Sequence, residues 1–549
     1  MKGASRTYVL GFFLLLGVAA GLRFWGLDSG LPHLMTRPDE EVLLLKTRFP
    51  ASGQLDLQYN LRHPGVPSAY IFLLWGVGEV GLPVMQTLGY APPGDYLHSL
   101  DRFPARLLLL ERILSALAGI ASVAALMWFT RLELGGPTAL CAGAILATSF
   151  LHVRESHSAK PDVALGLFAI LALGLLARMA REGTTRNAVK AGAAIGFGLA
   201  MKPPALLLFV PAWVAGMMSS TAAGWRRLVP VKSIIVVLVA VLIFVATSPD
   251  LFTNPETRHQ LVNIVYIVFP EFTPEGEESP VAKTATTPAR DVIGGYDYYY
   301  NFAYRHGAGW VIYVLTPMAV VWGFLSRTPL AILSSLFSVV GLVVFAGSTA
   351  WQARYLIPLL PGAAVLVAGM LQAGIRRLSP ENCHGPLLAV ATLVVIAQPL
   401  RTSASFDEIV ARTDTRGQTT NWVRENLPPG SIVGVAGTVF WGWGEPWMPG
   451  NVKRVQVGLE PGALDQAGVE YLVTHDHPLF SSTIDPALLR RLEPRLELLT
   501  EFSPFVEDGE GASFDAQDAY YVPITGLDAV DRPGPVVKIY RVRADGGRR

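Results

Sequence analysis

The sequence predicts a polytopic α-helical membrane protein with a small C-terminal α/β domain on the outer face of the membrane. Two observations support this fold class. The 549 residues are 51% hydrophobic and only 16% charged, whereas soluble domains carry about 25% charged residues. Long apolar segments recur through residues 1–400, and after Arg401 the chain changes to short strand-like runs.

Composition also excludes several classes of protein. The net charge of +1 implies no general attraction to nucleic acid. The two cysteines, Cys141 and Cys383, lie in or near different apolar segments. We therefore expect neither a disulfide framework nor a cysteine metal site.

Eleven segments are candidates for membrane spans, each of which needs about 20 mostly apolar residues. Tyr8–Leu27 is interpreted as an uncleaved first span, because no small-x-small cleavage site is evident. Ten more begin near Leu107, Pro137, Val163, Ala188, Pro203, Ser233, Ala308, Leu330, Tyr355 and Leu387.

Basic residues decide the orientation of these spans. They fall in alternate connections, which the positive-inside rule assigns to the cytoplasm. The loops 28–106 and 248–307 are then on the outer side. The segment 66–88 is apolar enough to span, but Glu79 and several glycines interrupt it. We interpret it as an interfacial or re-entrant helix.

The C-terminal domain is expected to cover 401–549, after a transmembrane domain over 1–400. The segment Asn421–Leu427 reads as the end of an amphipathic helix, which Pro428-Pro429-Gly430 would stop. Strand-like runs follow at Ser431–Val435, Val469–Val473 and Val536–Arg541.

The outer connections collect the unusual polar residues. Two acids, Asp39 and Glu40, follow the first span, and a charged patch extends from Arg154 to Asp162. A carboxylate can act as general base toward an acceptor, and Lys or Arg can hold a phosphate. The alternative for each residue is a solvated loop position or a side chain that snorkels from a helix end.

Five stretches, in this order, resemble the GT-C glycosyltransferases of the protein-mannosyltransferase and aminoarabinose-transferase kind. They are Pro38-Asp39-Glu40, His63-Pro64, Glu111–Gly119, Gly198–Lys202 and Arg354–Pro361. The resemblance implies a GT-C-like fold and transfer of a sugar, with inversion, from a polyprenyl-phosphate donor to a lipid, glycan or protein acceptor. Two departures, His63-Pro64-Gly65 and Arg37 before Pro38, leave the substrate subfamily open.

The resemblance also implies residue roles. Asp39 matches the catalytic acid and Glu40 its neighbour, while Lys202 and Arg354 match basic positions near the donor phosphate. The full substrate-binding set that we predict is His63, Arg112, Lys160, Asp162, Lys202, Arg354 and Tyr355.

No metal ligands are assigned, since the spacing of His63, Glu155 and His157 matches no recognised site; a divalent ion is left open as a cofactor. The tyrosine-rich run Tyr296–Tyr300 suits interfacial anchoring, with a sugar-binding wall as the alternative. We expect a bacterial inner (cell) membrane location, with the active site facing the periplasm or cell exterior and membrane lipids around the spans. The competing functions are a multi-span transporter or flippase and a non-catalytic scaffold. No internal repeat of the transporter kind is apparent.

Overall fold

A computed structural model describes residues 6–55, 68–220, 227–255, 257, 294–348, 351–437, 442–460, 462–479, 482–516, 518 and 520–543. The chain divides into two compact units. The first comprises Met1–Phe24 and Val42–Ala404, and the second comprises Trp25–Glu41 and Ser405–Arg549. The segment Trp25–Glu41, which we expected at the end of the first span and in the outer loop that follows it, groups with the C-terminal unit instead.

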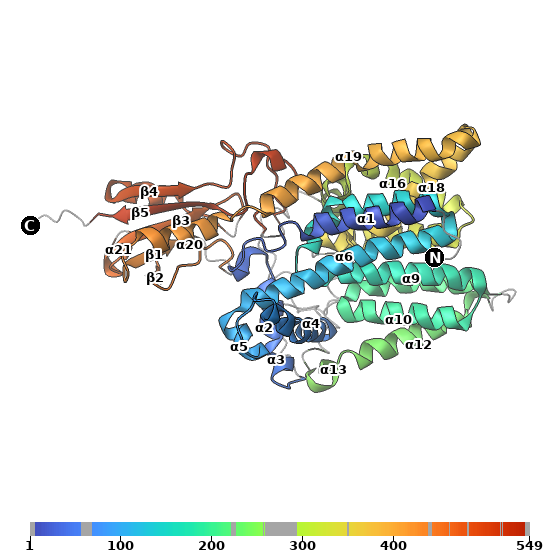
Figure 1. Ribbon diagram of the computed structural model, residues 1–549, viewed down its shortest axis with the longest axis horizontal. Coiled ribbons are helices and arrows are strands. Elements are labelled where there is room, and N and C mark those ends of the chain that lie inside the picture. Colours follow the sequence, from blue (N-terminus) through green and yellow to red (C-terminus); the bar gives the residue numbers. More distant parts are fainter. Residues whose placement is uncertain are drawn as a thin grey trace, which may run out of the picture. The chain divides into compact units, whose positions relative to one another are not determined.

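The first unit is helical (Figure 1). Its longer helices are α1 (Arg6–Phe24), α4 (Ser68–Thr87), α6 (Pro104–Leu134), α7 (Gly136–Thr148), α9 (Asp162–Glu182), α10 (Thr185–Met201), α11 (Phe209–Ser219), α12 (Val231–Ala246), α16 (Trp310–Leu325), α17 (Pro329–Gly347), α18 (Leu360–Leu378) and α19 (His384–Val410). Shorter helical segments connect them: α2 (Glu40–Lys46), whose first two residues fall in the second unit, α3 (Arg48–Ala51), α5 (Tyr96–Arg102), α8 (Phe150–Ser156), η2 (Pro203–Leu208), α13 (Asp250–Thr253), η6 (Asp297–Tyr304), α15 (Arg305–Ala308), η7 (Ala353–Leu356) and η8 (Glu381–Cys383).

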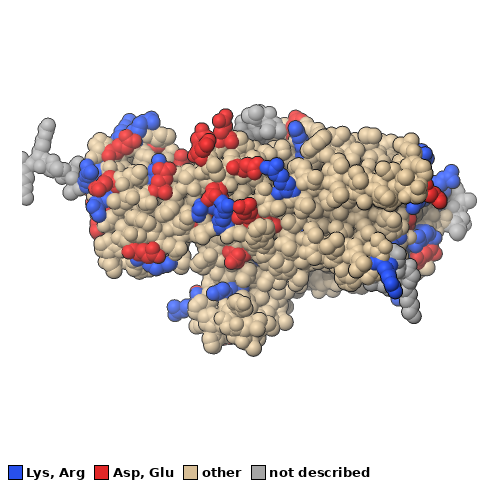
Figure 2. Space-filling view, turned by 45° about the horizontal axis from the view of Figure 1, so that its top comes forward, with Lys and Arg blue, Asp and Glu red and all other residues tan. Residues whose placement is uncertain are grey.

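Six helices among the described residues are long and apolar enough to cross a membrane, or eight if two bent pairs each count as one span. Two further apolar helical segments, Pro203–Ser219 and Val231–Ala246, are shorter. The segment Ser68–Thr87, which we expect at the interface, meets the length and composition of a span. Figure 2 shows a broad, nearly uncharged surface over these helices, as a membrane-embedded region requires.

The hairpin of α9 and α10 illustrates how local sequence sets the helix ends. Gly183 ends α9 in the left-handed conformation, with φ 65°, which a residue without a Cβ adopts at little cost. The Thr184 side chain then caps α10 by accepting a hydrogen bond from the Asn187 backbone N–H. Because the two helices are antiparallel neighbours of 21 and 17 residues, the start of α9 lies near the end of α10.

The second unit contains a five-stranded mixed sheet. Its strands are β1 (Ile432–Ala436), β2 (Lys453–Gln456), β3 (Tyr471–Asp476), β4 (Leu496–Phe502) and β5 (Val536–Val542), in the order β2-β1-β3-β5-β4. Strand β1 is parallel to β2 and β3, whereas β5 is antiparallel to β3 and β4. Strands β1, β3 and β5 overlap the three predicted runs, although β3 begins two residues later than its run and ends three residues later.

Helices cover both faces of this sheet. Val423 and Leu427, from α20 (Thr415–Asn426) and the residue after it, pack with Val433, Val473 and Ile539 on one face. The other face packs against Leu464 of α21 (Ala463–Gln466) and Leu492 of α22 (Pro486–Leu492). The short helices η1 (Leu34–Thr36), η9 (Glu493–Arg495) and η10 (Leu527–Ala529) complete the unit.

Candidate functional site

Four of the predicted site residues meet at one place in the helical unit. Asp162 begins α9, Lys202 directly follows α10, and Arg354 and Tyr355 lie in η7. The Lys202 Nζ atom donates to Asp162 Oδ1 at 2.6 Å, and Arg354 Nε lies 3.9 Å from Asp162 Oδ2. The Lys202 ammonium also lies 4.6 Å from the centroid of the Tyr355 ring, in a cation–π arrangement.

Two cations and one carboxylate meet in this group. The side chains of Lys202, Arg354 and Asp162 are only 13%, 10% and 3% exposed. Lys160, two residues before Asp162, is also buried. Largely buried positive charge favours an anionic ligand, because the surroundings supply little water to stabilise it. The arrangement can therefore bind a phosphate or carboxylate.

Contacts between aromatic rings stabilise the segment that carries Arg354 and Tyr355. The Tyr355 ring packs on Phe345, and Phe345 on Tyr299. The Tyr299 hydroxyl accepts a hydrogen bond from the Gln352 backbone N–H at 3.1 Å. Tyr299 belongs to the π-helical segment η6, a conformation often found at functional sites. Tyr299 is thus buried in the protein and links the tyrosine-rich run to the Arg354 segment.

A buried basic residue, Arg23, sits at the break between α7 and α8, which are bent by 58°. Its Nη1 donates to the carbonyls of Ala19 and Ala147, at 3.0 and 3.1 Å, and its Nη2 lies 2.9 Å from His152 Nδ1. Carbonyls in the last turn of a helix lack intrahelical partners. Arg23 therefore stabilises the end of α7 and fixes α8, from which the chain runs to Lys160 and Asp162. No motif in the sequence around Arg23 predicts this role.

The remaining residues of the predicted set are placed separately. Arg112 is buried in α6, next to the buried Glu111. His63 lies outside the described residues. Asp39 and Glu40 belong to the C-terminal unit. Glu40 is fully buried, and Asp39 adopts φ 73°, a conformation that few residues other than glycine adopt.

The pKa of Glu41, which follows Asp39 and Glu40, departs clearly from its usual range. Burial raises the pKa of Glu41 to about 7, with further upward contributions from Asp39 and Glu40, while a hydrogen bond from Trp443 Nε1 (3.0 Å) acts in the opposite direction. Between the ordinary glutamate pKa, about 4.3, and pH 7 the folded protein retains a proton that the unfolded chain releases. The contribution of Glu41 to stability is therefore present at low pH and lost as pH rises through this window.

We expect Glu41→Gln to remove this pH-dependent loss of folding stability. The loss amounts to about 3 kcal/mol between the ordinary glutamate pKa and pH 7. Thermal unfolding of the detergent-solubilised protein between pH 5 and pH 8 measures it. The melting temperature of the wild type should fall relative to that of the variant as pH rises. Parallel curves for the two proteins would contradict the assignment.

The described residues do not fit a metal centre. Among them, no group of three or more His, Cys, Asp and Glu side chains is arranged to hold a metal ion. Glu155 is ion-paired with Arg154 at 2.6 Å, and His157 Nδ1 lies 2.9 Å from the Val153 carbonyl oxygen. We therefore derive no step through a metal.

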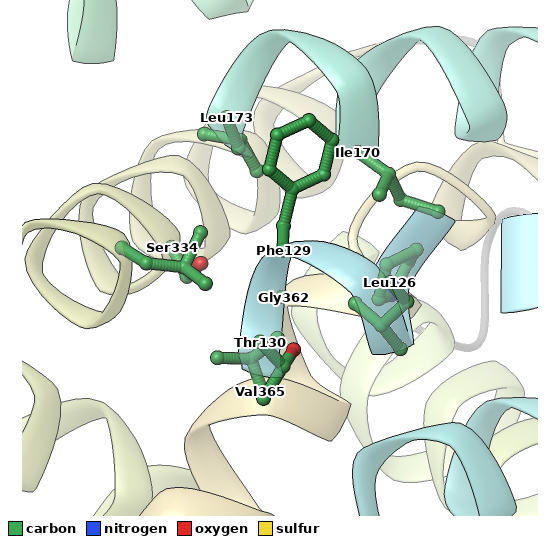
Figure 3. A pocket seen from close by; sticks show the side chains of 10 residues that line it. Leu126, Phe129, Thr130, Ile170, Leu173, Ser334, Gly362 and Val365 are labelled. Atoms are coloured by element: carbon green, nitrogen blue, oxygen red, sulfur yellow. The ribbon is translucent and has the colours of Figure 1, made fainter. Parts of the chain in front are cut away.

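A small cavity lies among α6, α9, α17 and α18, away from the charged group (Figure 3). Leu126, Phe129 and Ile170 line it, and its volume of about 10 Å³ is roughly the room for one water molecule. Ile170 is eight residues after Asp162, roughly 12 Å along α9. This cavity is too small for a sugar, so we do not assign it to the site.

Comparison with known proteins supports the predicted fold. Residues 110–252 match the family model described as dolichyl-phosphate-mannose-protein mannosyltransferase. The apo structure of the Archaeoglobus fulgidus oligosaccharyltransferase aligns with a TM-score of 0.53 and 10% identity, covering 90% of this chain and 73% of that one. Apo ArnT from Cupriavidus metallidurans aligns with a TM-score of 0.50 and 14% identity, covering 96% and 97%. No curated protein matches the sequence.

The fold and the apolar helices define an integral membrane protein with a GT-C fold. Within that class, the fold is of the protein-mannosyltransferase and ArnT type.

Proposed function

We propose that this protein is a membrane glycosyltransferase that moves a sugar from a polyprenyl-phosphate carrier to a lipid, glycan or protein acceptor. The acceptor hydroxyl or amine attacks the anomeric carbon, and the bond from that carbon to the phosphate oxygen breaks. The polyprenyl phosphate leaves with the bonding electrons, and the acceptor proton passes to the Asp39 carboxylate. Attack opposite the leaving group inverts the anomeric carbon.

The buried Lys202–Asp162–Arg354 group carries this proposal. The two cations suit the phosphate of a carrier lipid, whose charge increases when the sugar leaves. Asp162 holds Lys202 in place through the 2.6 Å contact. The Archaeoglobus oligosaccharyltransferase, which has the same fold, has also been solved with a dolichol-phosphate and an inhibitory peptide, with a TM-score of 0.52 and 13% identity over 86% of this chain.

We propose the remaining roles from the resemblance. Glu40 supports Asp39, and Tyr355 positions Lys202 through its ring. His63, Arg112 and Lys160 assist in binding the substrate. We also propose a bacterial inner membrane location with the active site facing outward.

We expect Arg354→Gln to weaken binding of undecaprenyl phosphate about 10–100-fold, because a charge-assisted contact to phosphate contributes about 1.5–3 kcal/mol. Native mass spectrometry of the purified protein, titrated with undecaprenyl phosphate, measures the affinity. Lys202→Gln should have a similar effect.

The matched control is Arg377→Gln, since Arg377 lies in the same unit but is exposed at the end of α18. Wild-type affinity in Arg354→Gln and Lys202→Gln would refute the phosphate-binding role. The transfer reaction itself is identified by mass spectrometry of lipids and glycans from cells with and without the protein. A sugar-modified product that depends on the protein distinguishes an enzyme from a scaffold.

A further inference from the structure

The segment Trp25–Glu41 is part of the C-terminal unit, although the 363 residues Val42–Ala404 separate it from the rest of that unit. This segment contains Asp39, the proposed base. Four of its residues, at positions 33, 35, 37 and 41, contact residues of the C-terminal α/β fold, so Asp39 is flanked by contacts on both sides.

The first contacts precede Asp39. His33 Nδ1 accepts a hydrogen bond from the Met35 N–H, so the ring proton is on Nε2, which donates to the Glu445 carbonyl at 2.9 Å. Desolvation and the nearby Arg416 lower the pKa of His33 to about 4. Arg416 also donates to the Met35 carbonyl at 3.3 Å.

Arg416 is itself held rigidly. It is 1% exposed, and its guanidinium binds Asp414 in two places, with Nε–Oδ1 at 2.8 Å and Nη2–Oδ2 at 2.6 Å. A second Nη1 contact reaches the Trp443 carbonyl. Arg416 therefore connects the loop after β1 to the segment that carries Asp39.

Further contacts are made by the residues two positions to either side of Asp39. The Arg37 guanidinium carbon lies 3.8 Å from the Tyr520 ring centroid, and Arg37 Nη1 lies 3.7 Å from Asp518 Oδ2. On the other side, Trp443 Nε1 donates to Glu41 Oε1 at 3.0 Å. Between these contacts, Asp39 is held at φ 73°, a conformation that costs about 1–3 kcal/mol and requires support from its surroundings.

Two of the contacting residues lie in the same loop. Trp443 and Glu445 belong to the loop that follows parallel strand β1 at its carboxyl end. In open α/β sheets, that end of the strands is where ligands bind. Here two residues of the loop after β1, Trp443 and Glu445, contact the protein's own segment Trp25–Glu41.

We propose that the C-terminal α/β unit is a positioning part of the catalytic apparatus, in which Arg37, Arg416 and Trp443 fix the backbone around Asp39. The proposal rests on the proposed role of Asp39. It assigns to the loop after β1 the task of holding a catalytic segment.

The test uses full-length protein with Trp443→Phe, which removes the N–H donor and keeps an aromatic ring. We expect formation of the sugar-modified product to slow about 10-fold, with affinity for undecaprenyl phosphate unchanged. Hydrogen–deuterium exchange of the peptide covering 34–41 should become faster. Arg37→Gln should have the same two effects. Arg37→Lys should partly restore the rate of product formation, because it keeps the charge.

Trp447→Phe is the matched control, since Trp447 is 53% exposed in the same loop. Wild-type exchange and product formation in Trp443→Phe would overturn the proposal. So would equal acceleration in Trp447→Phe. If Asp39→Asn retains full activity, the proposed role of Asp39 fails, whereas the exchange experiment still decides whether the C-terminal unit holds the segment.

Discussion

Replacing Asp39 by asparagine should lower the rate of sugar transfer by about 10²–10⁴-fold, the range that a general base contributes. Asparagine is nearly isosteric and also tolerates the positive φ that Asp39 adopts. The fold should therefore persist, and only the proton acceptor is lost. Mass spectrometry of the product from a deletion strain that produces the wild type or the variant measures the effect.

Asp28→Asn is the matched control, because Asp28 is exposed in the same segment. Affinity for undecaprenyl phosphate should be unchanged in Asp39→Asn, since the residues proposed to bind the phosphate lie in α9, directly after α10 and in η7. Normal product formation by Asp39→Asn would exclude Asp39 as the base. Loss of both activity and phosphate binding would indicate a structural role instead.

The group of charged residues around Asp162 could be anticipated because the sequence pattern indicates where the helices end. Basic residues assigned the connections to two sides, and this placed Asp162, Lys202 and Arg354 on the same side. The structure brings all three together. The identity of the carboxylate that Lys202 binds could not be predicted from the sequence, because it depends on how α9 packs against α10.

Contacts that join distant parts of the chain were not predictable. Trp443 and Glu41 are 402 positions apart, and neither belongs to a periodic pattern. Strand β2 was missed for a different reason: Lys453–Gln456 is a mostly exposed edge strand with one apolar residue, so it has no hydrophobic signal. The three predicted strands, by contrast, are β-branched runs in the centre of the sheet.

Arg23→Met should destabilise the protein by about 3 kcal/mol, because the buried Ala147 carbonyl and His152 Nδ1 lose their donor. The thermal unfolding temperature of the detergent-solubilised protein measures this. Since Arg23 fixes α8, which leads to Lys160 and Asp162, affinity for undecaprenyl phosphate should fall as well. Arg6→Met is the control, since Arg6 is exposed at the other end of α1.

Gly119 provides an independent test of the same packing. A Cβ at this position of α6 would lie 2.5 Å from Ser156 Oγ and 2.7 Å from Arg23 Nε, whereas a Cβ at Gly17 of α1 would meet no atom within 4 Å. We expect Gly119→Ala to cost about 1–3 kcal/mol by overpacking, and Gly17→Ala to be neutral or stabilising. If Gly119→Ala and Arg23→Met both leave unfolding and phosphate affinity unchanged, Arg23 does not hold α8, and the orientation of the Asp162 group must depend on α9 and α10 alone.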